Sequence, residues 1–80
     1  MQHSVIIVQR KGGGYVKGAK VVLGFSFSDH PLSAGNTGSV YTNSDGEATL
    51  KHSNTGPATV YVNGCDEGTM NTPGEKIVYI

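Results

Sequence analysis

The chain has 80 residues, with six basic and six acidic side chains, twelve glycines and no tryptophan. A chain of this length forms one domain with a thin core, so we expect a single domain over residues 1–80. The balanced charge argues against electrostatic binding to nucleic acid or to a membrane surface. Abundant glycine with only 15% charged residues is typical of short strands and turns rather than helices.

The first two predicted strands lie on either side of a glycine-rich turn. Residues 4–9 contain four consecutive β-branched apolar residues, which indicate a strand covered on both faces or paired near the middle of a sheet. Residues 12–14 are all glycine and predict a turn rather than a phosphate loop, because no helix follows. Residues 19–27 predict a second strand, with Gly24 at a bulge or a point of close packing. Its inward face comprises Val21, Leu23, Phe25 and Phe27.

The middle of the chain predicts a long loop followed by a hairpin. Residues 28–38 are rich in Pro, Gly, Asn and Ser, which indicates a loop. Residues 39–42 and 47–52 alternate as two strands of a hairpin, with Ala48 and Leu50 pointing inward. The turn between them combines Asn, Ser and Asp side chains, which bond to their own backbone, with Gly46, which supplies a positive φ.

The last third predicts a strand, a second long loop and a closing strand, over residues 58–63, 64–74 and 75–80. In the first of these strands, Val60 and Val62 point to the core. Six or seven short strands without a helix predict an all-β chain. We expect a small Greek-key β-sandwich of transthyretin-like or immunoglobulin-like type, with a small barrel as the alternative.

No pattern in the sequence carries a reaction. Residues 43–47 alternate oxygen-bearing side chains as a calcium loop does, but the distal acidic ligand is missing. Cys65 lies beside Asp66 and Glu67, a poor setting for a nucleophilic thiolate. The chain has three histidines, His3, His30 and His52, and they are not spaced in the sequence as the ligands of a metal site are. We therefore expect no enzyme activity, no cofactor and no metal site.

The two predicted loops are the candidate binding sites, because loops on a rigid sandwich often carry recognition. Their candidate residues are His30, Leu32, Asp66, Glu67 and Met70. Four basic residues in the first twenty, Arg10, Lys11, Lys17 and Lys20, indicate a solvated strand edge or a small patch for an acidic partner. Four tyrosines could instead form a platform for a sugar, and they are Tyr15, Tyr41, Tyr61 and Tyr79.

Three stretches resemble known β-sandwich families. Residues 14–21, Gly-Tyr-Val-Lys-Gly-Ala-Lys-Val, resemble the first motif of carboxypeptidase-regulatory-like domains, and residues 42–48 resemble their second motif. Asn43 stands where that family often has Asp. Residues 63–80, with Pro-Gly before the last strand, are similar to the family's ending. Residues 46–50 are also similar to a stretch of invasin-like bacterial immunoglobulin domains.

The resemblance implies a transthyretin-like sandwich with an accessory or adaptor role. Such domains are appended to enzymes, surface proteins or the secretion spikes of bacterial or phage assemblies. We therefore expect a non-catalytic module that binds a protein partner or serves as a structural spacer, and the alternative is a carbohydrate-binding module. Exposed strand edges also allow a homodimer.

The sequence holds few signals of cellular location. The longest apolar run near the N-terminus spans only four residues, so we expect neither a signal peptide nor a membrane-spanning segment. A single cysteine excludes an internal disulfide. The chain could be a natural protein or a domain excised from a secreted or surface assembly.

Overall fold

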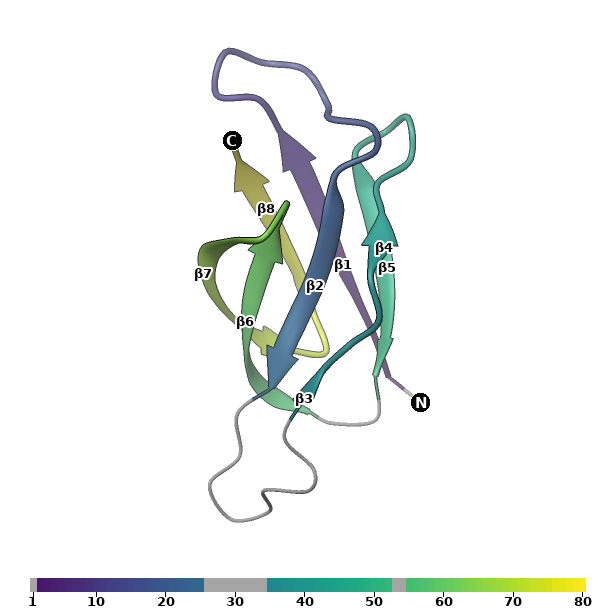
Figure 1. Ribbon diagram of the computed structural model, residues 1–80, viewed down its shortest axis with the longest axis vertical. Coiled ribbons are helices and arrows are strands. Elements are labelled where there is room, and N and C mark those ends of the chain that lie inside the picture. The colour runs from purple at the N-terminus through teal and green to yellow at the C-terminus, as the bar shows by residue number, and fades with distance from the viewer. Residues whose placement is uncertain (1, 26–34, 53–54) are drawn as a thin grey trace.

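The structure, a computed structural model, consists of strands and turns over the residues that it describes, 2–25, 35–52 and 55–80 (Figure 1). Its strands in chain order are β1 (Gln2–Gln9), β2 (Lys20–Phe25), β3 (Gly35–Asn36), β4 (Val40–Tyr41), β5 (Glu47–His52), β6 (Gly56–Val62), β7 (Cys65–Thr72) and β8 (Glu75–Tyr79). They form two sheets that pack as the layers of a small β-sandwich. The prediction of an all-β sandwich is confirmed.

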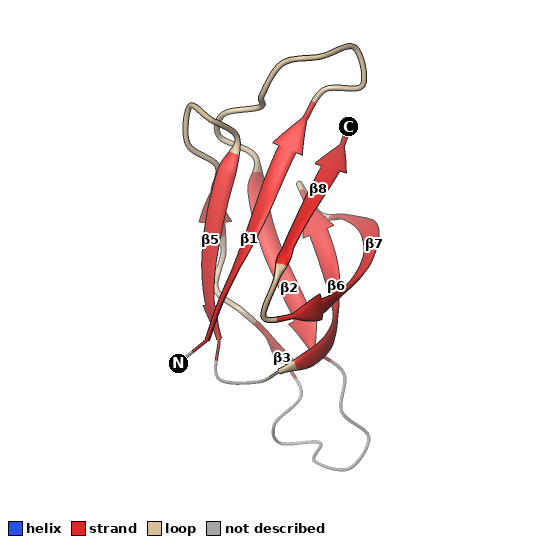
Figure 2. Cartoon of the chain, turned by 180° about the vertical axis from the view of Figure 1, so that it is seen from behind, coloured by secondary structure: helices blue, strands red, loops and turns tan. Residues whose placement is uncertain are grey.

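The first sheet has three strands in the order β5-β1-β8, with β1 in the middle. β1 pairs antiparallel with β5 and parallel with β8 (Figure 2). Ile6 and Val8 are fully buried against the second sheet, whereas Val5 and Ile7 are half-buried on the outer face. The two-faced apolar run of β1 therefore reflects a central strand, as its pattern predicts.

The second sheet has the order β3-β2-β6-β7, and β4 also pairs with β2. Val21, Leu23 and Phe25 of β2 are buried, as their alternation predicts, and Phe27 lies outside the described residues. The register of β2 on β6 runs without a break past Gly24, so the bulge expected there is absent. The irregular pairing instead lies between β6 and β7.

The turn at residues 43–46 connects the two sheets, so the predicted hairpin is wrong. β4 pairs with β2 in one sheet, whereas β5 pairs with β1 in the other. The turn chemistry itself is as predicted. Asn43 Oδ1 accepts the N–H groups of Asp45 at 2.9 Å and Glu47 at 3.0 Å, and Gly46 has a φ of 75°. Val40 lies opposite Val21 of β2 and packs against the core as part of the second sheet.

The second correction concerns residues 64–74, which form strand β7 and its following turn rather than a long loop. Asn63 and Gly64 both have positive φ, at 53° and 85°, and this geometry makes a two-residue hairpin turn. The turn places Cys65 opposite Val62 and starts an antiparallel ladder. Local turn chemistry and pairing with β6 therefore outweigh the low strand propensity of the Asp, Gly and Asn residues.

Candidate binding surface

The outer face of the three-stranded sheet carries a row of apolar side chains that no described element covers. We call these side chains the exposed strip, and they are Val5, Ile7, Tyr15, Ile77 and Tyr79. Tyr15 is 58% exposed, Ile77 43% and Tyr79 53%. A cluster of large exposed apolar side chains on one face marks a site of interaction more often than scattered ones do.

Strand register assembles the exposed strip. Ile7 of β1 lies opposite Ile77 of β8, and Gln9 lies opposite Tyr79. On its other side, Gln9 forms an isolated antiparallel bridge with Tyr15, which follows the glycine-rich turn. Paired residues point to the same face of a sheet, so two tyrosines flank Gln9 on the outer face.

The outer face changes character at β5. The outward side chains of β5 are polar or charged, and they are Glu47, Thr49 and Lys51. A shallow hollow of about 190 Å³ lies at this boundary and is lined by Ile7, Tyr15, Asp45 and Glu47. A hollow lined by two large apolar residues and two acidic residues suits a basic side chain that has an aliphatic stem.

Gly46 shapes this hollow by letting Tyr15 approach the turn. A Cβ at Gly46 would lie 2.6 Å from the Val8 carbonyl oxygen and 3.1 Å from the Tyr15 Cβ. The Val8 N–H donates to the Gly46 carbonyl at 2.8 Å, which ties the turn to β1. Glycine at this position therefore fixes both the turn and the place of Tyr15.

The predicted binding residues are not gathered at one site. His30 and Leu32 lie outside the described residues. Met70, expected in a loop, is 9% exposed on β7 and belongs to the hydrophobic core. Asp66 is exposed at the start of β7, where its Oδ1 accepts the Gly68 N–H at 2.8 Å, and Glu67 beside it is half-buried.

Ser4 and His52 form a buried polar pair with the appearance of a catalytic dyad. The Ser4 Oγ lies 2.8 Å from the His52 Nε2, and the hydroxyl also accepts the Gly74 N–H at 3.3 Å. Both residues are buried, and the His52 ring lies 5.2 Å from the Phe25 ring. A substrate could not reach this hydroxyl without opening the sandwich, so the pair is part of the packing.

Metal-ligating and reactive side chains do not cluster in the described part of the chain. No group of three His, Cys, Asp or Glu side chains there could hold a metal ion. The oxygen of Asn43 that a calcium loop would need already accepts two backbone N–H groups. Cys65 is exposed on β7 as a free thiol.

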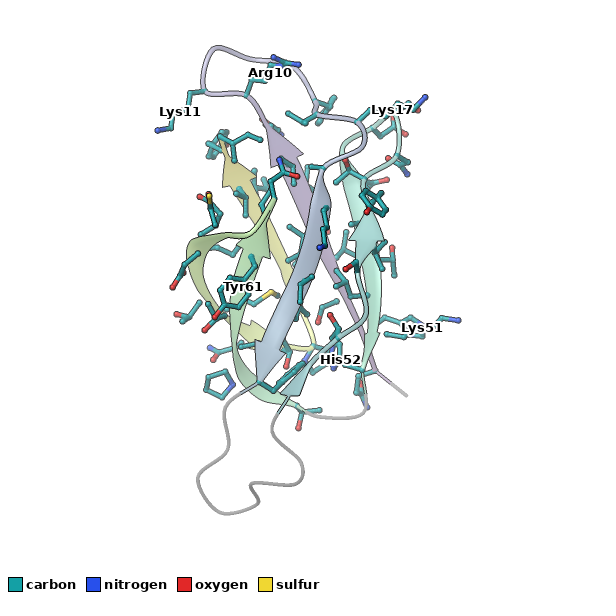
Figure 3. The ribbon with its side chains drawn as sticks, viewed as in Figure 1. Arg10, Lys11, Lys17, Lys51, His52 and Tyr61 are labelled. Carbon is teal, nitrogen blue, oxygen red and sulfur yellow. The ribbon has the colours of Figure 1, made fainter. Side chains whose placement is uncertain are left out.

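The basic residues do not converge on one patch. Figure 3 shows Arg10, Lys11 and Lys17 at the end of the sandwich near the glycine-rich turn, with their side chains directed to different sides. Lys20 lies at the start of β2, opposite Tyr41. This spread leaves each charge in solvent.

The tyrosines divide between the two sheets. Tyr15 and Tyr79 belong to the exposed strip, whereas Tyr41 and Tyr61 lie on the outer face of the second sheet. The binding residues predicted from the sequence do not include Ile7 and Ile77. The signals that could have found them are the apolar residues on both faces of β1 and of β8, since only one face of each strand meets the core.

Comparisons with known proteins found no matching family model, curated protein or solved structure. Within the described residues, no helix is long and apolar enough to cross a membrane.

Proposed function

We propose that this protein is a non-catalytic module that binds a protein partner through the exposed strip. The observation that carries the proposal is the concentration of Tyr15, Ile77 and Tyr79, all more than 40% exposed, on the outer face around β1. Tyrosine is enriched where protein interfaces concentrate their binding energy, because its large apolar ring also carries a polar hydroxyl.

The hollow beside the strip defines the chemistry of the partner. The hollow is lined by the acidic residues Asp45 and Glu47 and by Ile7 and Tyr15. A partner surface with apolar side chains and one neighbouring Lys or Arg would complement both features. This arrangement matches an accessory or adaptor role, which the resemblance to carboxypeptidase-regulatory-like domains implies.

Photo-crosslinking in an extract of the source organism tests the proposal. A photoreactive phenylalanine analogue would replace Tyr79 in one sample and Tyr41 in another. Tyr41 is a matched control, because it is 63% exposed but lies on the opposite sheet. We expect one dominant protein adduct at position 79 and none of that adduct at position 41. Equal labelling at both positions, or none at either, would contradict the proposal and favour a structural spacer.

A second candidate, carbohydrate binding, shares the same surface. Tyr15 and Tyr79 lie on either side of Gln9, two strand spacings apart or roughly 10 Å. Two rings at this separation with an amide between them could hold adjacent sugar units. On a glycan array, a positive wild type that loses binding in Tyr15→Ala and retains it in Tyr61→Ala would favour this function. No glycan bound by the wild type would remove it.

A further inference from the structure

We infer that the free edge of β8 takes up an extended segment of the partner as an additional strand. This inference rests on the proposed function, and it names the form that the partner takes. An edge strand presents backbone N–H and C=O groups that another strand can pair with, and such pairing is a recurring mode of peptide recognition.

Backbone hydrogen bonds show which groups of β8 are available. The Val5 N–H donates to the Gly74 carbonyl at 2.9 Å, and the Ile80 N–H donates to the Gln9 carbonyl at 2.9 Å. Along a strand, backbone groups alternate between its two sides. The backbone N–H and C=O groups of the even-numbered residues of β8 therefore point toward β1. Those of Glu75, Ile77 and Tyr79 point away from it.

The other sheet edges in the described part of the chain are less suited to pairing. At the edge of β5, the carbonyl of its first residue, Glu47, is already occupied, because it accepts the Asn43 N–H at 2.9 Å. β7 has a break in register and a positive φ at Gly68, which bends the strand. β3 and β4 have two residues each. The register of β8 on β1 is unbroken from Glu75 to Tyr79.

The surroundings of β8 favour a single extended segment over a second copy of the sandwich. Figures 1 and 2 show β7 curving outward beyond β8. Lys76, on the inner face of β8, reaches toward β7, where its Nζ would lie 4.0 Å from a Cβ at Gly68. β7 stands beside this edge, where a second sandwich would have to approach, so we take a single extended segment as the occupant.

The side chains of β8 set the sequence of that segment. On the outer face, Ile77 and Tyr79 offer apolar contacts and Glu75 offers a charge. Antiparallel pairs outnumber parallel ones, so we take the added strand as antiparallel to β8. The segment then reads, from its N-terminus, apolar-x-apolar-x-basic, and its basic residue lies opposite Glu75.

Titration of the labelled protein with the peptide acetyl-Thr-Val-Thr-Ile-Thr-Lys-Thr-amide, followed by amide NMR, tests this inference. We expect the largest shifts at the amides of Glu75, Ile77 and Tyr79 and none from a scrambled peptide. No shift with up to about 2 mM peptide, the range of very weak affinity, would overturn the inference. A concentration-dependent dimer with these same shifts in the absence of peptide would also overturn it.

Two substitutions at one position isolate the backbone contribution. Ile77→Pro and Ile77→Thr both remove the isoleucine side chain, and both leave the hydrogen bonds to β1 in place. Only proline also removes the N–H of residue 77, which points away from β1. We expect Ile77→Pro to bind at least about fivefold more weakly than Ile77→Thr. Tyr79→Pro is a second variant in case the first does not fold, and Thr49→Pro, on the opposite edge, should bind as the wild type does.

The outcomes separate the inference from the proposed function. If Ile77→Pro and Ile77→Thr bind the peptide equally and Tyr15→Ser loses peptide binding, the inference of an added strand is overturned. The exposed strip then stays as the binding surface. Peptide binding that follows the backbone pattern, without a Tyr79 crosslink to a cellular protein, would support the edge and contradict the proposed function.

Discussion

Thr42 lies just before the turn at residues 43–46 and holds the loop that precedes β2. Removing its hydroxyl should therefore lower the stability of the fold. Its Oγ1 accepts the Ala19 N–H at 2.9 Å and donates to the Val16 carbonyl at 2.5 Å. The residue is buried. Thr42→Val keeps the shape of the side chain and removes the hydroxyl, so the Ala19 N–H and the Val16 carbonyl both lose this partner. We expect a loss of about 2–4 kcal/mol in the free energy of unfolding. A buried group left unpaired costs roughly 1–3 kcal/mol, and the cost is smaller at the Val16 carbonyl because that bond is only part-buried.

Thr42→Ser is the matched control, because it keeps the hydroxyl and removes one methyl group. Its expected cost is about 1 kcal/mol. Urea unfolding followed by circular dichroism measures both variants, with the slope of the transition checking that they unfold as the wild type does. If Thr42→Val proves as stable as Thr42→Ser, the hydroxyl does not hold this corner and the reasoning is refuted.

Three further predictions concern the same corner and the core. Gly46→Ala should cost at least about 2 kcal/mol, because its Cβ would lie 2.6 Å from the Val8 oxygen at a φ of 75°; a neutral result in urea unfolding would contradict the turn geometry. Asn43→Ala should cost about 1–2 kcal/mol, whereas Asn43→Asp should change stability by less than about 0.5 kcal/mol, because its carboxylate still accepts two N–H groups. Equal losses in these two variants would disprove that role. Leu50→Ala should cost about 2–5 kcal/mol by leaving a core cavity, and a loss below 1 kcal/mol would contradict its burial.

The strands that follow from the sequence are those in which alternation and burial agree. Ala48 and Leu50 of β5, and Val60 and Val62 of β6, face the core as their spacing requires. The sheet to which each strand belongs could not be derived in this way. An Asx turn closed by glycine fits a hairpin as well as a change of sheet, and only the pairing of β4 with β2 separates the two.

The candidate surface was harder to predict than the fold. Met70 looked like a loop residue because Gly, Asp and Asn surround it in sequence, yet pairing with β6 turns it into the core. The exposed strip depends on a parallel contact between β1 and β8, which lie at opposite ends of the chain. No local pattern specifies such a contact. The local signs of it were the apolar residues on the outer faces of β1 and β8.

Quantitative affinity capture from the source organism's extract tests the central claim most directly. The experiment compares three proteins: the wild type, the double variant Tyr15→Ser with Ile77→Thr, and the control Tyr41→Ser. Mass spectrometry identifies the proteins that each of them captures. We predict one dominant protein that the wild type and Tyr41→Ser retain equally and that the double variant loses. Equal retention by all three folded proteins would contradict the exposed strip as the binding surface.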